Sequence, residues 1–303
     1  MNHTVKRKIG AKTWNEWSWG WFLIAPTMIG LIVLNFIPIV QTAYLSFFKS
    51  GDFGRGNIYI GWENYRKLIH DPQVWHAVSN TLLYTLLVVP VSIAIAMLVA
   101  VLLNGKLAGR SLYRTIYFIP MVAAPAAVTM VWRWMYNQHY GLINYGLSKL
   151  GLPAVNWTTD PRVAILSIAV IGIWSVIGYN MVLLLAGLQE IPKDYYEASD
   201  IDGASRVRQF FVITLPLVTP TLFFVVVTTI IQAMQVFDVI YMMIDVSNPA
   251  YDHTVSLVYL FYNNSFKYSN KGYGSAIVMV LLALIMIITF FQMRAQKKWV
   301  NYM

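Results

Sequence analysis

Residues 272–293 read GYGSAIVMVLLALIMIITFFQM, a stretch of 22 residues without a charged side chain. The part from Ala276 to Phe290 is apolar on nearly all sides, whereas a strand of a membrane barrel alternates between two faces. A helix needs about 20 residues to cross a hydrocarbon core of roughly 30 Å. The stretch therefore predicts a transmembrane helix.

Five further uncharged stretches precede it along the chain. They cover residues 17–48, 72–105, 115–132, 163–189 and 209–237. Charged residues make up 12% of the 303 positions and apolar residues 58%, against about 25% and about 45–50% in soluble domains. A soluble protein can bury one such helix, but six would leave it too little polar surface. We therefore expect an all-α membrane protein with about six transmembrane helices.

These spans divide the chain into three segments. We expect a cytoplasmic N-terminal segment at residues 1–19, a transmembrane domain at 20–293 and a cytoplasmic C-terminal tail at 294–303. The first apolar stretch is too long for a signal peptide and is not closed by a small-residue cleavage site. The predicted spans lie near residues 20–47, 76–103, 113–135, 163–188, 217–244 and 273–293, and residues 189–216 connect the fourth to the fifth.

The distribution of basic residues indicates the orientation. Connections on the side of the two termini hold 13 of the 22 lysine and arginine residues, and the rest are spread over longer loops. Because short cytoplasmic loops carry an excess of these residues, we expect both termini to be cytoplasmic. The net charge of +9 follows from this bias, so nucleic acid is not an expected partner. Tryptophan and tyrosine near the outer span ends indicate contact with membrane lipid, or alternatively stacking on a sugar.

The sequence offers no catalytic constellation. It contains no cysteine, and none of its five histidines pair at the spacing of metal ligands. It has neither a phosphate-binding G-x-x-x-x-G-K-[ST] loop nor a G-x-S-x-G nucleophile elbow. We therefore expect a chain that is not an enzyme and binds no metal or cofactor of its own. If transport is driven by ATP, another polypeptide must supply the ATPase.

The connection at residues 189–216 reads QEIPKDYYEASDIDGASRVRQFFVITLP. Pro192 suits the first position of a helix, and Asp194 and Glu197 favour the helix dipole in its first turns. Gly203 can adopt the left-handed conformation that ends a helix. A second helix then restarts and leads into the fifth span. The sequence predicts a short helix, a sharp corner and another short helix.

This connection resembles the signature of the inner-membrane permeases of ATP-binding-cassette (ABC) importers. That signature reads E-A-A, three residues, G, nine residues, then I-x-L-P. The chain matches it with Glu197-Ala198-Ser199, Gly203 and Ile213-Thr214-Leu215-Pro216, and departs from it only in the small residue Ser199.

Further stretches are similar to the carbohydrate-uptake branch, which includes importers of maltose and glycerol phosphate. One outer loop departs from that branch, because Ser247-Asn248-Pro249 stands where Gly-Gly-Pro is common. The supporting stretches are Gly61–Tyr65, Asn80-Thr81, Gly141–Asn144, Gln189–Pro192, Phe237-Asp238 and Gly272–Ala276.

The resemblance implies a fold, a location and partners. The fold would be that of a type I ABC importer permease, in the inner membrane of a bacterial or archaeal cell. A second, non-identical permease would complete the translocation path, two cytoplasmic ATP-binding-cassette subunits would use ATP and Mg, and an extracellular solute-binding protein would deliver a sugar or oligosaccharide. The implied contacts to an ATPase subunit are Glu197, Ala198, Ser199, Asp202, Gly203, Ile213, Leu215 and Pro216.

Polar residues inside the spans are candidates for the solute path. Such residues are costly in lipid and usually face a cavity or another helix. Uncharged hydrogen-bonding groups beside aromatic rings suit a neutral sugar, although they also suit interhelical hydrogen bonds, and the partner permease could hold most solute contacts. The candidates are Asn80, Tyr84, Trp174, Tyr179, Asn180, Gln232, Gln235 and Asp238.

Two other classes of function compete with this one. An ion-coupled secondary carrier should show buried carboxylates, yet Asp238 is the single acidic residue inside a predicted span. A membrane-embedded enzyme would need a cluster of acid, base, nucleophile or metal ligand, which the sequence lacks. The permease of an ATP-driven importer is therefore the leading hypothesis.

Overall fold

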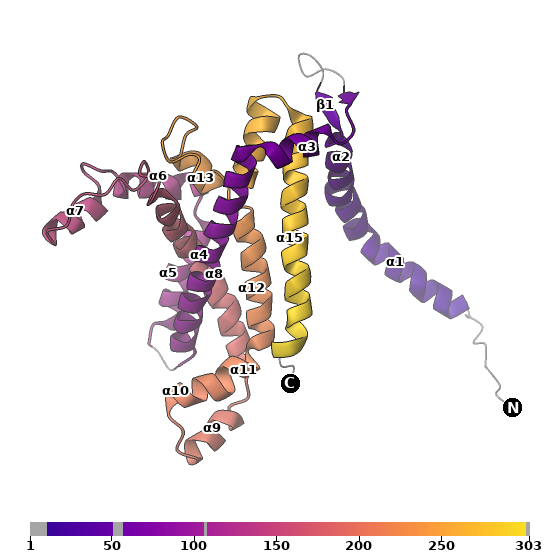
Figure 1. The fold of residues 1–303 in the computed structure, drawn as a ribbon. Helices are drawn as coiled ribbons and strands as arrows, with labels where there is room; N and C mark the ends of the chain where they lie inside the picture. The colour runs from indigo at the N-terminus through magenta and orange to yellow at the C-terminus, as the bar shows by residue number, and fades with distance from the viewer. Residues whose placement is uncertain (1–10, 51–56, 106–107, 301–303) are drawn as a thin grey trace.

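The computed structural model describes residues 11–50, 57–105 and 108–300 and is mostly helical (Figure 1). Five of the described helical segments are long and apolar enough to cross a membrane. The fold therefore agrees with the predicted all-α membrane class. The five segments are Trp17–Leu45, Pro72–Asn104, Ala164–Gln189, Thr219–Met243 and Lys271–Trp299.

The first half of the chain begins with a long helix and a small hairpin. Residues Phe48–Ser50 (β1) and Asn57–Tyr59 (β2) pair antiparallel. The helices of this half are α1 (Ala11–Leu31), a π-helical turn at Ile32–Phe36, α2 (Ile37–Leu45), α3 (Glu63–His70), α4 (Pro72–Asn104), α5 (Arg110–Val122), α6 (Pro125–Met135) and α7 (Leu142–Lys149).

The second half contains the connection between α8 and α12 that carries the signature. Its helices are α8 (Ala164–Gln189), α9 (Asp194–Ile201), α10 (Arg206–Gln209), the π-helical turn η3 (Phe210–Thr214), α11 (Leu215–Leu217), α12 (Thr219–Met234), α13 (Asp238–Met243), α14 (Leu257–Tyr262), a π-helical turn at Asn263–Lys267 and α15 (Lys271–Trp299). The helices α9 and α10 lie at one end of the bundle together with the last turns of α15, and the hairpin, α3 and α13 lie at the other (Figure 1). We refer to these as the signature end and the hairpin end.

The segment expected as one span over residues 113–135 is broken. Helices α5 and α6 meet at an angle of 97°, separated by Ala123 and Ala124. Both residues have extended ψ values, 139° and 130°. Pro125 accounts for the conformation of Ala124, because a proline disfavours the helical conformation of the residue before it and lacks the N–H that would continue the helix. With this pair counted as one span, the described chain has up to six.

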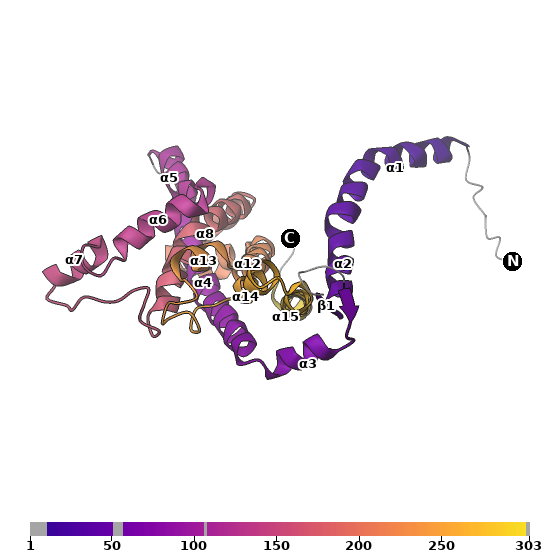
Figure 2. The same ribbon diagram turned by 90° about the horizontal axis from the view of Figure 1, so that it is seen from above.

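The first helical segment lies apart from the bundle. Helix α1 projects away from the other helices, and only its continuation α2 approaches α15 (Figures 1 and 2). None of the described side chains in its most apolar stretch is buried. An apolar surface of this length must face lipid or another polypeptide, because its exposure to water is energetically unfavourable.

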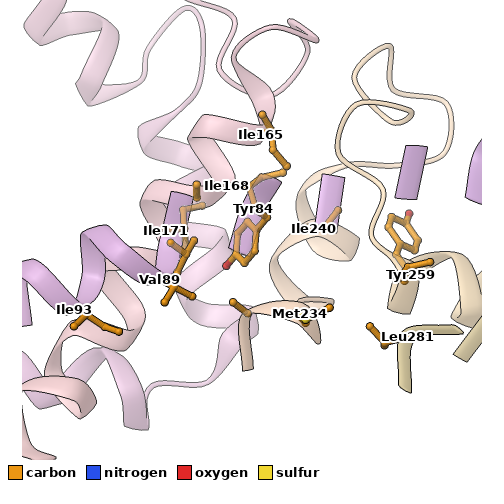
Figure 3. Packing of buried hydrophobic residues seen from close by; sticks show 14 of the residues in the cluster. Tyr84, Val89, Ile93, Ile165, Ile168, Ile171, Met234, Ile240, Tyr259 and Leu281 are labelled. Carbon is orange, nitrogen blue, oxygen red and sulfur yellow. The ribbon is translucent and has the colours of Figure 1, made fainter. Parts of the chain in front are cut away.

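The core forms where α4, α8 and α12 pack together. The side chains of Ile168 and Ile171 in α8 are essentially inaccessible, and the ring of Tyr84 from α4 lies beside them (Figure 3). Glycines of α8 allow the neighbours to approach closely. A Cβ on Gly178 would overlap the backbone carbonyl of Tyr117 in α5.

This contact predicts that Gly178→Ala destabilises the fold. A backbone carbonyl cannot move aside as a flexible side chain can, so we expect a cost of about 1–3 kcal/mol from overpacking. The measurement is the melting temperature of the purified subunit in detergent. The matched control is Gly146→Ala in α7, where nothing lies within 4 Å of the added Cβ. Equal melting temperatures for the two variants would contradict this packing.

Candidate functional site

The signature end carries a helix–corner–helix whose corner is closed by backbone hydrogen bonds. Gly203 follows α9 with a φ of +72°, in the left-handed region that favours glycine. Its N–H donates to the carbonyl of Asp200 at 3.1 Å, and the N–H of Ala204 donates to the carbonyl of Ser199 at 3.0 Å. Ser205 then caps α10 by accepting from the N–H of Arg208 at 3.4 Å. The helix, corner and second helix expected from the sequence are all present.

Helix α9 and the turn at Gly203, residues 194–203, which we call the corner, present an exposed surface. Glu197, Ala198, Asp202 and Gly203 are exposed, and Ser199 is half-buried. Ile201 was not among the predicted contacts, yet 87% of it is accessible. A single exposed isoleucine is common on protein surfaces, so Ile201 is of interest because it lies beside the signature residues. Its position four residues after Glu197, and hence on the same side of α9, is the signal that could have identified it.

The remaining signature residues lie elsewhere. Ile213 belongs to η3, and Leu215 and Pro216 belong to α11, between the corner and α12. All three are half-buried, and Leu215 packs against the core. The signature therefore has an exposed part at the corner and a packed part at the base of α12.

A polar cavity of about 260 Å³ lies in the bundle where two helical segments are interrupted. One interruption is the break between α5 and α6, and the other is the non-helical stretch at residues 235–237 between α12 and α13. Gaps in regular helices make room here that continuous helices would fill. The polar side chains of the lining are Tyr84, Ser175, Thr229, Gln232, Gln235 and Asp238.

The cavity gathers four of the eight solute-path candidates. Tyr84 reaches it from α4, Gln232 from α12, Gln235 from the stretch that follows and Asp238 from the start of α13. Asp238 is the only charged side chain among the lining residues, the other five polar side chains are neutral, and the rest of the lining is apolar. Such a lining suits hydroxyl groups of a solute.

The other four candidates lie outside the lining. Tyr179 is half-buried on α8 and does not reach the cavity. Trp174 lies edge-on to Trp132, with ring centroids 5.8 Å apart, beside a separate apolar groove.

The two asparagine candidates make internal hydrogen bonds. The Nδ2 group of Asn80 donates to the carbonyls of Asp252 and Val255 at 2.9 and 3.1 Å. Asn180 is buried and its Oδ1 accepts from the hydroxyl of Thr229 at 3.1 Å. Asn80 joins parts of the fold, which is the alternative role that the sequence left open, whereas Asn180 makes one such hydrogen bond and its buried Nδ2 group has no partner in the described part of the chain.

An aromatic cluster beyond the cavity was not predicted. Phe237, which lines the cavity, stacks on Tyr241 with ring centroids 5.1 Å apart and lies as close to Tyr262. The Nζ atom of Lys267 lies 5.2 Å from the centre of the Tyr241 ring. The cluster depends on the packing of α13 against α14, so no local sequence pattern announces it.

Comparison with known proteins agrees with this architecture. Residues 72–301 match the family described as "Binding-protein-dependent transport system inner membrane component". The sulfoquinovosyl glycerol permease SmoG of Agrobacterium fabrum is 34% identical over 90% of this chain and 88% of that protein. The trehalose/maltose permease MalF of Thermococcus litoralis is 32% identical over 89% of this chain and 90% of that protein.

Solved structures show the same fold. A chain of a bacterial ABC transporter that imports the acidic polysaccharide alginate superposes with a TM-score of 0.83 at 21% identity, covering 96% of this chain and 100% of that chain. A chain of the MetNI methionine transporter gives a TM-score of 0.52 at 20% identity, covering 77% and 96%. The predicted family and type I permease fold are confirmed. The chain belongs to the family of inner-membrane components of binding-protein-dependent transport systems and is a permease subunit of its carbohydrate-uptake branch.

Proposed function

We propose that this subunit passes a sugar or oligosaccharide through the polar cavity and is driven by ATPase subunits that dock on the corner of residues 194–203. The observation that carries the proposal is the corner. It combines a left-handed glycine, an exposed carboxylate at Glu197 and an almost fully exposed Ile201 at the end of a packed helical bundle. An apolar side chain surrounded by polar ones is the composition of a protein-binding contact.

The solute is proposed from the lining of the cavity. The amide groups of Gln232 and Gln235 can donate to and accept from the hydroxyl groups of a sugar, and the hydroxyl oxygens of Ser175 and Thr229 can accept from them. The ring of Phe237 adds an apolar face for the C–H side of a pyranose. The names of the relatives, which include a trehalose/maltose permease and a sulfoquinovosyl glycerol permease, support a sugar-like solute.

Partner subunits complete the proposed machine. A second, non-identical permease would close the cavity and could cover the unburied apolar surface of α1. Two cytoplasmic subunits would bind ATP and Mg, since this chain has no phosphate-binding loop. An extracellular binding protein would deliver the solute, as the alginate importer's structure with its periplasmic protein supports. The location would be the inner membrane of a bacterium or archaeon, with the signature end in the cytoplasm.

Reconstitution tests this proposal. In proteoliposomes, the importer assembled with both permeases and the ATPase subunits should hydrolyse ATP faster when loaded binding protein is added. This subunit alone should show no hydrolysis. Uptake of a sugar by this chain alone, driven by a proton or sodium gradient, would instead support the ion-coupled carrier and contradict the proposal.

A further inference from the structure

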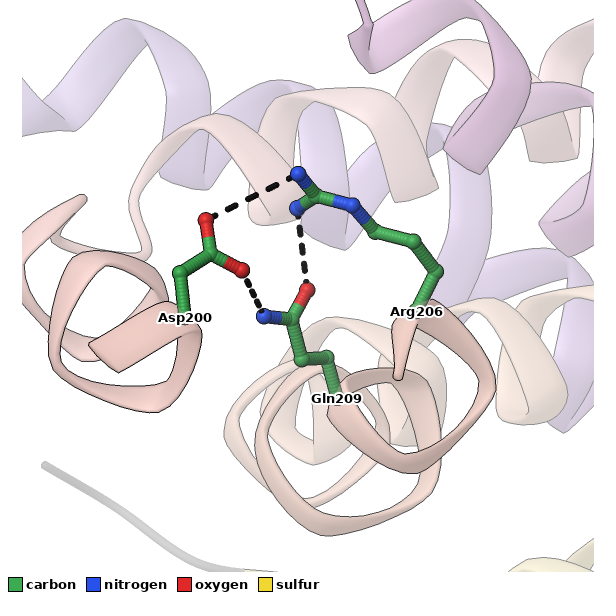
Figure 4. Close-up of polar contacts among 3 residues, drawn as sticks. All are labelled: Asp200, Arg206 and Gln209. Atoms are coloured by element: carbon green, nitrogen blue, oxygen red, sulfur yellow. Dashed lines mark hydrogen bonds and ion pairs between the residues drawn. The ribbon is translucent and has the colours of Figure 1, made fainter. Parts of the chain in front are cut away.

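Three polar side chains join α9 to α10 across the corner, and we call Asp200, Arg206 and Gln209 the clasp (Figure 4). The Nε2 group of Gln209 donates to Oδ1 of Asp200 at 2.5 Å. The guanidinium of Arg206 donates to Oε1 of Gln209 at 3.0 Å and lies 3.6 Å from Oδ2 of Asp200. Gln209 therefore stands at the centre, with one hydrogen bond to each partner.

Burial identifies Gln209 as the essential member of the clasp. Its side chain is buried, whereas those of Arg206 and Asp200 are 80% and 50% exposed. The exposed ion pair is screened by water and adds little to stability. An unpaired buried amide, in contrast, is costly, so Gln209 favours the arrangement that keeps Asp200 within reach.

A second hydrogen bond fixes α9 one turn earlier. The hydroxyl of Tyr196 lies 3.0 Å from that of Thr214, a buried residue at the end of η3. Tyr196 and Asp200 are four residues apart and so lie on the same side of α9. Glu197 and Ile201, each one residue further on, stay exposed.

These hydrogen bonds matter because the corner is not packed tightly against the bundle. A cavity of about 430 Å³ separates it from the ends of α4 and α8, and both Tyr196 and Gln209 line this cavity. Among the described residues of α9, Tyr196 is the one that packs against the hydrophobic core, so apolar packing gives α9 a single anchor on this side. The polar contacts to α10 and η3 supply the others.

We propose that the clasp and the Tyr196–Thr214 contact make α9 and the base of α12 one rigid lever, with Gln209 as a positioning residue for energy coupling. This rests on the proposed docking of an ATPase on the corner. Force applied at Ile201 passes through Gln209 and Thr214 to α12, whose far end lines the solute cavity. Without these contacts, α9 would pivot about Gly203 and its motion would not reach α12.

The test measures opening of the cavity separately from ATP hydrolysis in the complete importer. Because the chain has no cysteine, Met121→Cys in the cavity lining supplies a single reactive thiol in this subunit. An importer whose other subunits lack cysteine is reconstituted, and a membrane-impermeant maleimide is added outside, with and without ATP and vanadate. In the parent importer, in which the clasp is intact, the extent of labelling at this thiol should change when ATP and vanadate trap the nucleotide.

Gln209→Leu keeps the size of the side chain but removes both hydrogen bonds. We expect it to assemble and hydrolyse ATP within about twofold of the parent while the nucleotide-dependent change in labelling falls about fivefold or more. Asp200→Asn, which can still accept from Gln209, should retain the change. Arg206→Ala should have the smaller effect expected of an exposed partner.

Two results would overturn the proposal. One is an unchanged labelling response in Gln209→Leu, which would mean that α9 is positioned by other contacts. The other is an equal fall in assembly, hydrolysis and labelling, which would mean that Gln209 only stabilises the fold. Failure of the proposed function can be distinguished from failure of the clasp proposal. If the proposed function were wrong, even the parent with an intact clasp would show no nucleotide-dependent labelling.

Discussion

Gly203→Asp is expected to leave the subunit inserted and paired with its partner permease, while its association with the ATPase subunits falls by at least about tenfold. Nothing lies within 4 Å of a Cβ added at Gly203, so the subunit itself accommodates the side chain. The left-handed φ of +72° costs a residue with a side chain of order 1 kcal/mol. The larger effect comes from bulk and negative charge on the surface that meets the ATPase. Copurification of the subunits from detergent measures it.

Gly151→Asp is the matched control for this variant. Gly151 has a φ of +70° and equally open surroundings, but it follows α7 at the hairpin end, far from the corner. The backbone strain is therefore the same in both variants. If both copurified with the ATPase subunits to the same extent, the corner would not be the docking surface.

Gln232→Leu and Gln235→Leu should each lower sugar uptake by roughly tenfold at limiting solute, with ATPase docking unchanged. Each replacement removes hydrogen-bonding groups from the polar cavity, and a lost hydrogen bond to a buried partner costs about 1–3 kcal/mol. Uptake in proteoliposomes, with copurification of the ATPase subunits as a second readout, measures the effect.

Thr228→Leu is the control for these two variants. Thr228 lies on the same helix and its hydroxyl donates to the carbonyl of Phe224 within α12, outside the cavity lining. Its replacement should leave uptake close to that of the parent. Normal uptake in both glutamine variants would contradict the proposed path and assign the solute contacts to the partner permease.

Asn180→Leu should behave differently from the cavity variants. Asn180 is buried between helices, and its Oδ1 accepts from Thr229. Its loss would therefore lower the melting temperature of the subunit as well as uptake. A variant with reduced uptake and an unchanged melting temperature would return Asn180 to the solute path.

The sequence predicted the apolar helices well but not their interruptions. Runs without charge report where lipid surrounds the chain, because charge is costly there whatever the tertiary fold. An uncharged run does not report where the helix within it bends. Pro125 lies inside an uncharged run, so the run gives no sign of the 97° bend beside the proline.

The residues of the candidate site also divide into those that a local sequence pattern predicts and those that depend on the tertiary fold. Gly203 was predicted because the left-handed turn is a local requirement of the backbone. The exposure of Ile201 was not, because it depends on which neighbours the fold places around it. Asn80 and Asn180 were placed among solute-path candidates since a polar group in lipid can satisfy itself on a solute or on another helix, and only the fold decides between them.

Cysteine cross-linking at Ala198 tests the coupling role of the corner most directly. Ala198 is exposed on α9, and the native chain has no cysteine to interfere. In the assembled importer, Ala198→Cys should cross-link to a cysteine placed in the cleft of an ATPase subunit, with a yield that changes when ATP binds. Ser148→Cys, exposed on α7 at the hairpin end, should give no cross-link to that subunit. If the importer transports its solute while no cleft position cross-links to Ala198, the corner is not where ATP hydrolysis is coupled to transport.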